Sequence, residues 1–215
     1  MSEHPLMLNG DMVRAVLAGS KTQFRVPVKP NPEHWHTPII CEEYNPIRLV
    51  RGEEVPGPAV FGFASEDEGW KCPFGKPGDT LWVRETWRPC QPSEGKGSSI
   101  QYRAGGEYER KTDFPDVFRT KGSDRPDKWR PSIHMPRWAS RILLTVTDVR
   151  VERIQDISEQ DCCDEGCGSP ITRDCKRPKF MALWDTIYGK QKPDKPDLSW
   201  AANPWVWAIT FEVTL

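Results

Sequence analysis

The sequence lacks several features that would place a protein in a class at once. Its 215 residues carry a formal net charge of −1, so any contact with nucleic acid must come from a local patch rather than an overall basic surface. No run of about 18 apolar residues occurs, which predicts no transmembrane helix and no membrane partner. The opening stretch, MSEHPLMLNGD, lacks the basic and apolar regions of a secretory signal. We therefore expect a cytoplasmic protein whose seven cysteines are reduced thiols.

The usual catalytic motifs are missing too. The chain contains no G-x-x-x-x-G-K-[ST], G-x-G-x-x-G, G-x-S-x-G or H-E-x-x-H, so nucleotide hydrolysis and the familiar protease and hydrolase classes lose their usual support. Structural zinc sites normally use C-x2-C pairs. The clustered cysteines here have other spacings: Cys162, Cys163, Cys167 and Cys175. We expect no metal site, no structural disulfide and no cofactor.

Tryptophan and proline are abundant, with 10 and 21 residues respectively. Tryptophan can fill a core or form a platform on which bases stack. Much of the proline lies in two Pro- and Gly-rich stretches, at about 28–76 and 88–130. We interpret both stretches as long insertions into one domain.

Hydrophobic periodicity predicts the framework around these insertions. Strands are expected at Lys21–Val26, Thr80–Thr86, Arg141–Val151 and Trp205–Val213, the third with a bulge after Val146. Helices are expected after Asp11, which can cap the first of them, after the capping box of Ser158 and Asp161, and around Phe180–Tyr188. The last helix should pack one face against the sheet, the face of Phe180, Leu183, Trp184 and Ile187. Strands with few helices between them predict an α+β fold, a small β-barrel or sheet with helices at its rim.

The first candidate site is the polar exit of the N-terminal helix. Lys21 and Arg25 are partners for phosphate or carbonyl groups, and Thr22 and Gln23 can donate to a base edge. The alternative is an exposed strand start with solvated charges.

The second and third candidates combine charges with tryptophan. In LWVRETW, Arg84 and Glu85 lie between Trp82 and Trp87, and strand geometry places the two charges on opposite faces. The pair is either structural or faces a cleft. In DRPDKWRPSIHMPRWASR, basic residues alternate with aromatic ones, and we single out Arg137 and Trp138. This mixture is typical of single-stranded nucleic-acid binding, but a Pro-rich surface loop explains it as well.

Five stretches in order resemble an ASCH domain of the long type found in phage and prophage proteins. They are VLAGSKTQFRVPVKP, PGDTLWVRETW, RVERIQDISEQDCCDEGC, FMALWDTIYG and NPWVWAITFEV. The resemblance covers the framework from about residue 9 onwards but neither insertion. It implies a PUA-like β-barrel, a cleft between barrel and helices, and RNA binding. Some small members of the family are amidohydrolases that remove the acyl group of acetylcytidine.

Carried over by position, the resemblance implies that Lys21 corresponds to the catalytic lysine and Glu165 to the acidic residue. The threonine nucleophile of the enzymes falls on Phe24, which cannot attack an amide. Thr22 stands two residues away as a substitute. The leading hypothesis is therefore binding of RNA or a modified nucleoside. In it, Lys21 and Arg25 contact phosphate or base carbonyl, and Glu165 or Glu85 accepts from an exocyclic amine. Trp82, Trp87 or Trp138 stacks on the base.

Two alternatives remain at this point. The first is an amidohydrolase of acetylcytidine-type nucleosides, in which Lys21 and Glu165 activate Thr22 or a water. The second is a module that binds a phage or host protein through the two insertions.

Overall fold

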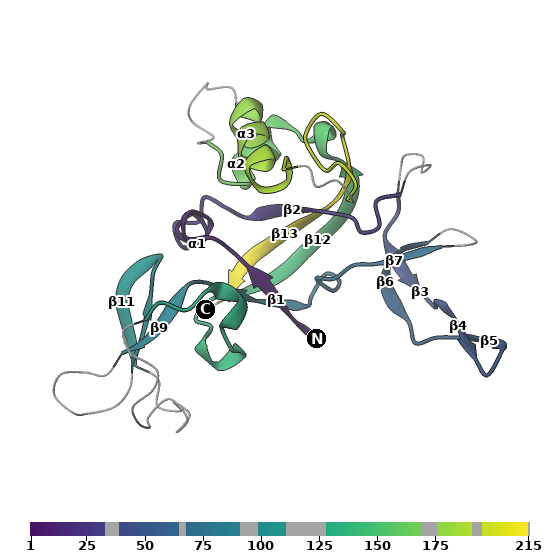
Figure 1. Ribbon diagram of the computed structural model, residues 1–215, viewed down its shortest axis with the longest axis horizontal. Coiled ribbons are helices and arrows are strands. Elements are labelled where there is room, and N and C mark those ends of the chain that lie inside the picture. The colour runs from purple at the N-terminus through teal and green to yellow at the C-terminus, as the bar shows by residue number, and fades with distance from the viewer. Residues whose placement is uncertain are drawn as a thin grey trace.

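The central element of the computed structural model is an open five-stranded sheet (Figure 1). The structure describes residues 1–32, 39–64, 68–90, 99–110, 128–168, 176–190 and 195–214. The strand order is β1-β8-β12-β13-β2. The bounds are Glu3–Met7 for β1, Thr80–Arg84 for β8, Leu143–Arg153 for β12, Trp205–Thr214 for β13 and Gln23–Pro27 for β2.

The expected strands lie in this one sheet, so the α+β prediction is confirmed at that level. The bulge is confirmed as well, because the β12–β13 register shifts between Val146 and Asp148. The sequence analysis missed β1, which pairs in parallel with β8. The expected closed barrel does not form among the described residues: β1 and β2 are the two outer strands of the sheet and do not pair with each other.

The helix α1 (Gly10–Leu17) connects these two outer strands. Asn9, not Asp11, caps it, because the Asn9 side chain accepts from the N–H of Met12. Asp11 lies in the first turn and pairs with Arg14 instead. Gly19 follows the helix with a φ of +69°, a conformation that favours glycine, and so allows the turn into β2.

The first insertion contains two small sheets. One has the order β3-β6-β7, and the other pairs β4 with β5. The bounds are Glu42–Tyr44 for β3, Ile47–Val50 for β4, Glu53–Pro56 for β5, Val60–Ala64 for β6 and Gly69–Lys71 for β7. Phe63 and Trp70 stack on each other, and Phe63 also meets Trp207 of β13. The β3-β6-β7 sheet therefore shares the main core.

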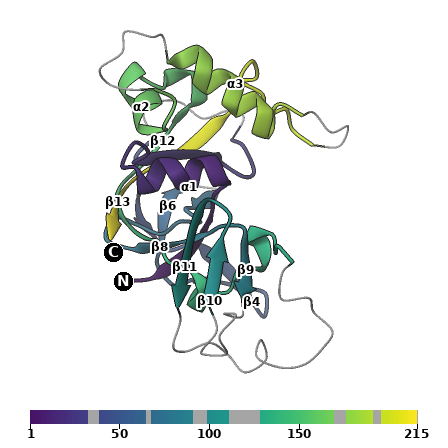
Figure 2. The ribbon, with the colours of Figure 1, turned by 90° about the vertical axis from the view of Figure 1, so that its left-hand side faces the viewer.

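The second insertion forms the sheet β11-β10-β9 on the other side of the main sheet (Figures 1 and 2). Its strands are β9 (Trp87–Cys90), β10 (Ser99–Tyr102) and β11 (Gly105–Arg110), and the short 3-10 helices η2 (Ser132–His134) and η3 (Arg137–Ala139) follow it. Fully buried Trp87, Ile100 and Met135 form a separate core here. Composition alone gave no reason to expect a packed unit in this stretch.

The helices of the C-terminal part pack against one end of the β12–β13 pair. They are η4 (Ile154–Asp156), α2 (Glu159–Asp164) and α3 (Arg177–Tyr188). Phe180 and Trp184 of α3 are buried against Val206 of β13, as predicted. Leu183 and Ile187 share that helix face but are not part of this buried cluster; together with Phe180 and Trp184 they line a cavity. None of the described helices has the length and hydropathy needed to cross a membrane.

Candidate functional site

The outer strand β2 supplies the first side of the candidate site. Its residues alternate, so Gln23 and Arg25 point to one face and Phe24 to the other. The N–H of Phe211 donates to the carbonyl of Thr22, which makes Thr22–Phe211 a hydrogen-bonded pair of the β2–β13 ladder. Alternation along an antiparallel ladder then points the backbone N–H and C=O of Arg25 away from β13, toward the free edge of β2.

The end of α2 supplies the second side. The expected capping box of Ser158 and Asp161 is present, and the helix ends with Glu165 as its C-cap. Lys21 and Glu165 form an isolated backbone bridge. The ammonium group of Lys21 donates to Oε2 of Glu165 over 2.6 Å and to its main-chain carbonyl over 3.0 Å. Both side chains are buried, 1% and 4% exposed, so the Lys21 ammonium needs the Glu165 carboxylate as its counter-charge.

Arg25 ties this pair to a larger network of buried charges. Its Nη1 donates to Oε1 of Glu165 over 3.1 Å, and its Nε donates to Oε1 of Glu152 over 2.8 Å. Asp161 lies 3.4 Å away. Burial alone would lower the pKa of Arg25, but attraction to Glu165 and Glu152 outweighs it and raises that pKa. The guanidinium is therefore a permanent positive charge inside the protein.

This network corrects one prediction. The side chain of Arg25 is 0% exposed and is surrounded by the carboxylates of Glu152, Asp161 and Glu165. A phosphate could reach it only by displacing these groups, so Arg25 does not have the predicted role of a phosphate contact. Gln23 is buried as well, and its side-chain carbonyl accepts from Arg25 over 2.5 Å.

A cavity of about 240 Å³ lies beside Lys21 and Glu165. Its apolar walls come from both outer strands of the sheet, from α1 and from α3, and the residues that form them include Leu6, Leu8, Met12, Phe24, Val26, Phe180, Leu183, Trp184 and Ile187. Lys21, Arg25 and Glu165 form a polar end, and Tyr188 also lines the cavity. Burial, aided by the charge of Glu165, raises the pKa of Tyr188 to about 12, so its phenol stays neutral at physiological pH.

Thr22, the substitute considered for the threonine nucleophile, does not reach the cavity. Thr22 is absent from the cavity walls, and the described walls contain no serine or threonine. Phe24 borders the cavity, but its ring packs into the main core, with its centroid 5.0 Å from that of Phe74. The structure thus brings Lys21, Glu165 and Phe24 together as expected and leaves Thr22 out.

The second candidate site, around Arg84 and Glu85, lies outside the cavity beside Lys21 and Glu165. Glu85 is buried and forms an ion pair with Arg141 over 2.8 Å, so its role is the structural one of the two considered above. Arg84 lies on the other face, over the ring of Trp82, and donates to the carbonyl of Ser132 over 3.1 Å. Neither charge lines the cavity beside Lys21.

The tryptophans proposed as stacking platforms are largely structural. Trp87 is 0% exposed in the core of the second insertion, so its predicted stacking on a base is wrong for this conformation. Trp138 is half-buried and packs edge-on against Trp87. Arg137 forms a surface ion pair with Glu3 over 2.7 Å. Of the predicted platforms, Trp82 is partly exposed but lies outside the cavity walls.

The aromatic wall from α3 was missed as part of the site. The 3.6-residue period of this helix identified its apolar face, but the period cannot separate residues that touch a core from residues that border a cavity. Leu6 and Leu8 were missed because β1 itself was not predicted.

The cysteine prediction is tested only in part, since Cys175 lies outside the described residues. Within the described ranges no cluster of His, Cys, Asp and Glu could hold a metal ion. Burial raises the pKa of Cys162 to about 12 and of Cys167 to about 11, which disfavours thiolate chemistry.

Comparisons with known proteins add no assignment: no family model matches the chain, and the searches of curated proteins and of solved structures find no match.

Proposed function

We propose that the cavity binds the base of a modified nucleoside, free or within RNA, and that Lys21 and Glu165 recognise its polar edge. The observation that carries this proposal is a buried Lys–Glu pair at one end of a mainly apolar and aromatic cavity. Small-molecule sites commonly combine apolar walls with a few fixed polar groups in this way.

The charges of the polar end favour a neutral ligand. Lys21, Arg25 and Arg150 face Glu152, Asp161 and Glu165, so the cations are already compensated and leave no net positive charge to attract a phosphate. A neutral heterocycle with both donors and acceptors would find the ammonium of Lys21 and the carboxylate of Glu165 side by side. The backbone N–H and C=O of Arg25, which point to the free edge of β2, add a further donor and acceptor.

We further propose that the main sheet is an opened form of the PUA-like barrel that the resemblance to ASCH domains implies. Leu6 and Leu8 come from the β1 edge of the sheet, and Phe24 and Val26 come from the opposite β2 edge. All four side chains nevertheless line one cavity. The two outer strands therefore curve toward each other across the cavity. In this interpretation, the ligand occupies the gap that would otherwise be closed by strand pairing.

A cavity-filling substitution tests the site without disturbing the ion network. Leu183→Trp places a larger side chain in the cavity wall, whereas Met181→Trp adds the same ring to an exposed position of the same helix. We expect wild type and Met181→Trp to bind members of a panel of the common nucleosides and acetylcytidine in calorimetric titrations. Leu183→Trp should bind them at least tenfold more weakly. Equal binding by all three proteins, or no binding by wild type, would refute the proposal.

The Lys21–Glu165 pair also favours a second candidate, hydrolysis of an acylated nucleoside. Because the described walls offer no hydroxyl except the neutral phenol of Tyr188, water would be the nucleophile. Glu165 would take its proton while the water attacks the acyl carbonyl, and Lys21 would stabilise the oxyanion. As the C–N bond breaks, Glu165 returns that proton to the departing nitrogen, which releases the carboxylic acid and the amine.

Assays of wild type and Phe24→Thr on acetylcytidine separate binding from hydrolysis. Turnover by wild type would establish the enzyme, and turnover by Phe24→Thr alone would show a latent one. Inactivity of both, with acetylcytidine bound, leaves binding as the function.

A further inference from the structure

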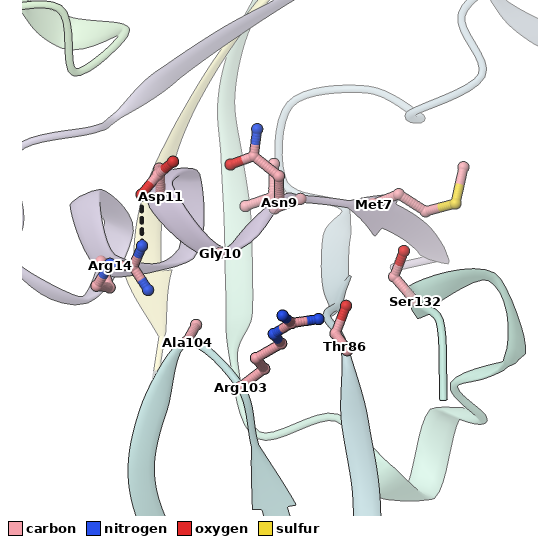
Figure 3. Close-up of a pocket in the computed structure, with 10 residues that line it drawn as sticks. Met7, Asn9, Gly10, Asp11, Arg14, Thr86, Arg103, Ala104 and Ser132 are labelled. Carbon is pink, nitrogen blue, oxygen red and sulfur yellow. Dashed lines mark hydrogen bonds and ion pairs between the residues drawn. The ribbon is translucent and has the colours of Figure 1, made fainter. Parts of the chain in front are cut away.

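A second hollow, a groove of about 500 Å³, is lined in part by the segment Met7–Asn9 (Figure 3). Met7, Leu8 and Asn9 also line the cavity, so the two hollows share this stretch of backbone. The other residues of the groove come from α1, from the β8–β9 connection, from the second insertion and from η2. We call this groove the arginine groove, after Arg103.

Arg103 is the charged group that the arginine groove leaves available. Asp11 and Arg14, the other charged residues in its walls, pair with each other. The side chain of Arg103 is exposed and has no hydrogen bond or ion pair within the described part of the chain. Its backbone N–H donates to the carbonyl of Thr86 over 2.9 Å. The turn that carries Arg103 is therefore anchored while its guanidinium is free.

Two hydroxyl groups accompany Arg103. Figure 3 shows the side chains of Thr86, Arg103 and Ser132 reaching the groove from different elements. Arg84 fixes the 3-10 helix that carries Ser132, because its guanidinium donates to the main-chain carbonyls of Ser132 and Ile133. A guanidinium fork beside two hydroxyl donors is a set of groups that recognises the oxygens of a phosphate.

We propose that the arginine groove binds the phosphate of a nucleotide whose base occupies the adjoining cavity. This inference rests on the proposed function of the cavity and adds to it the ligand class, a nucleotide rather than a free nucleoside. It also separates the two tasks in space: the compensated charges around Lys21 recognise a neutral base, and uncompensated Arg103 attracts the anion. The phosphate can belong to a mononucleotide or to the backbone of an RNA strand.

Paired titrations with nucleosides and their 5′-monophosphates test the groove. For a base that the cavity accepts, the monophosphate should bind wild type roughly tenfold or more tightly than the nucleoside, which is the effect of one charge-assisted contact. Arg103→Ala should reduce this ratio to about one and leave nucleoside affinity unchanged. Arg48→Ala is the matched control, since Arg48 is an exposed arginine of β4 outside both hollows, and it should keep the wild-type ratio.

The outcomes separate the two proposals. If nucleosides bind but phosphate brings no gain, or if the gain survives Arg103→Ala, the groove proposal is wrong and the cavity proposal stands. If no nucleoside or nucleotide binds, both are wrong. A short single-stranded RNA distinguishes the phosphate sources: a strand ligand predicts tighter binding to RNA than to the monophosphate, lost in Arg103→Ala, and a mononucleotide ligand predicts the reverse order of affinity.

Discussion

The buried pair of Lys21 and Glu165 makes an asymmetric prediction about stability. Glu165→Gln removes the carboxylate that compensates Lys21 and leaves the ammonium with the main-chain carbonyl of residue 165, 3.0 Å away. Lys21→Met removes the ammonium, but Glu165 keeps its contact with Arg25 at 3.1 Å. The first substitution strands a buried charge and the second does not.

The expected costs follow from this difference. Breaking a buried pair so that one charge is uncompensated costs about 3–5 kcal/mol, and we assign this range to Glu165→Gln. Lys21→Met should cost about 1–3 kcal/mol, the value of a hydrogen bond to a charged group, because methionine fills a similar volume. In the double variant the stranded ammonium is gone, so its cost should fall below the sum of the single costs.

Urea unfolding followed by tryptophan fluorescence measures these free energies, provided that the m-values of the variants agree. A cost of Lys21→Met equal to or above that of Glu165→Gln would refute the reasoning. So would strict additivity in the double variant, because it would mean that the two side chains do not stabilise each other.

Three further substitutions test other parts of the structure. Trp87→Ala should cost about 3–5 kcal/mol in denaturant unfolding through a lost core contact, while nucleoside affinity stays unchanged; loss of affinity without loss of stability would restore its role in stacking. Burial opposes ionisation of Asp161, but hydrogen bonds and Arg25 lower its pKa. The stability that the ionised Asp161 contributes is present above about pH 4 and is lost as pH falls through its folded pKa. Asp161→Asn should therefore make the free energy of unfolding fall less steeply toward acid pH, and an unchanged fall would contradict this. Gly62→Ala would place Cβ 1.9 Å from the carbonyl oxygen of Trp70 and should therefore cost about 1–3 kcal/mol in the same unfolding assay. A neutral effect would contradict this close approach of β6 and β7.

The framework could be predicted from the sequence because its signals are local. The alternation of Trp205, Trp207, Ile209 and Phe211 identifies a strand face that is indeed buried in the main core. The capping box at Ser158 identifies the start of α2 for the same reason, since both partners lie within one turn.

The insertions could not be predicted in this way. Their strands are short, and the alternating apolar residues Ile47 and Leu49 of β4 are exposed, so the pattern shows that a strand is present but not what it packs against. Their packing depends on distant partners, as when Trp70 stacks on Phe63 over β13. Local periodicity carries no information about such contacts.

Lys21, Glu165 and Phe24 could be predicted as members of the site, but the apolar walls of the cavity and the burial of its charges could not. The family resemblance brought Lys21, Glu165 and Phe24 to one place, and the structure does the same. The resemblance gave no sign that Arg25 would be enclosed by Glu152 and Asp161, because those carboxylates lie far from it in sequence. A pattern of basic residues therefore looked like a phosphate site, although the arginine proposed here to bind phosphate, Arg103, lies in the second insertion.

The most direct test of the central claim is the affinity of a cavity ligand for wild type and Lys21→Met, measured by calorimetry with the nucleoside panel while both proteins are folded. We predict that the nucleoside that binds wild type most tightly loses roughly tenfold or more in affinity with Lys21→Met, because a charge-assisted hydrogen bond inside a low-dielectric cavity is lost. Equal affinities for both proteins would contradict the claim that Lys21 and Glu165 recognise the base.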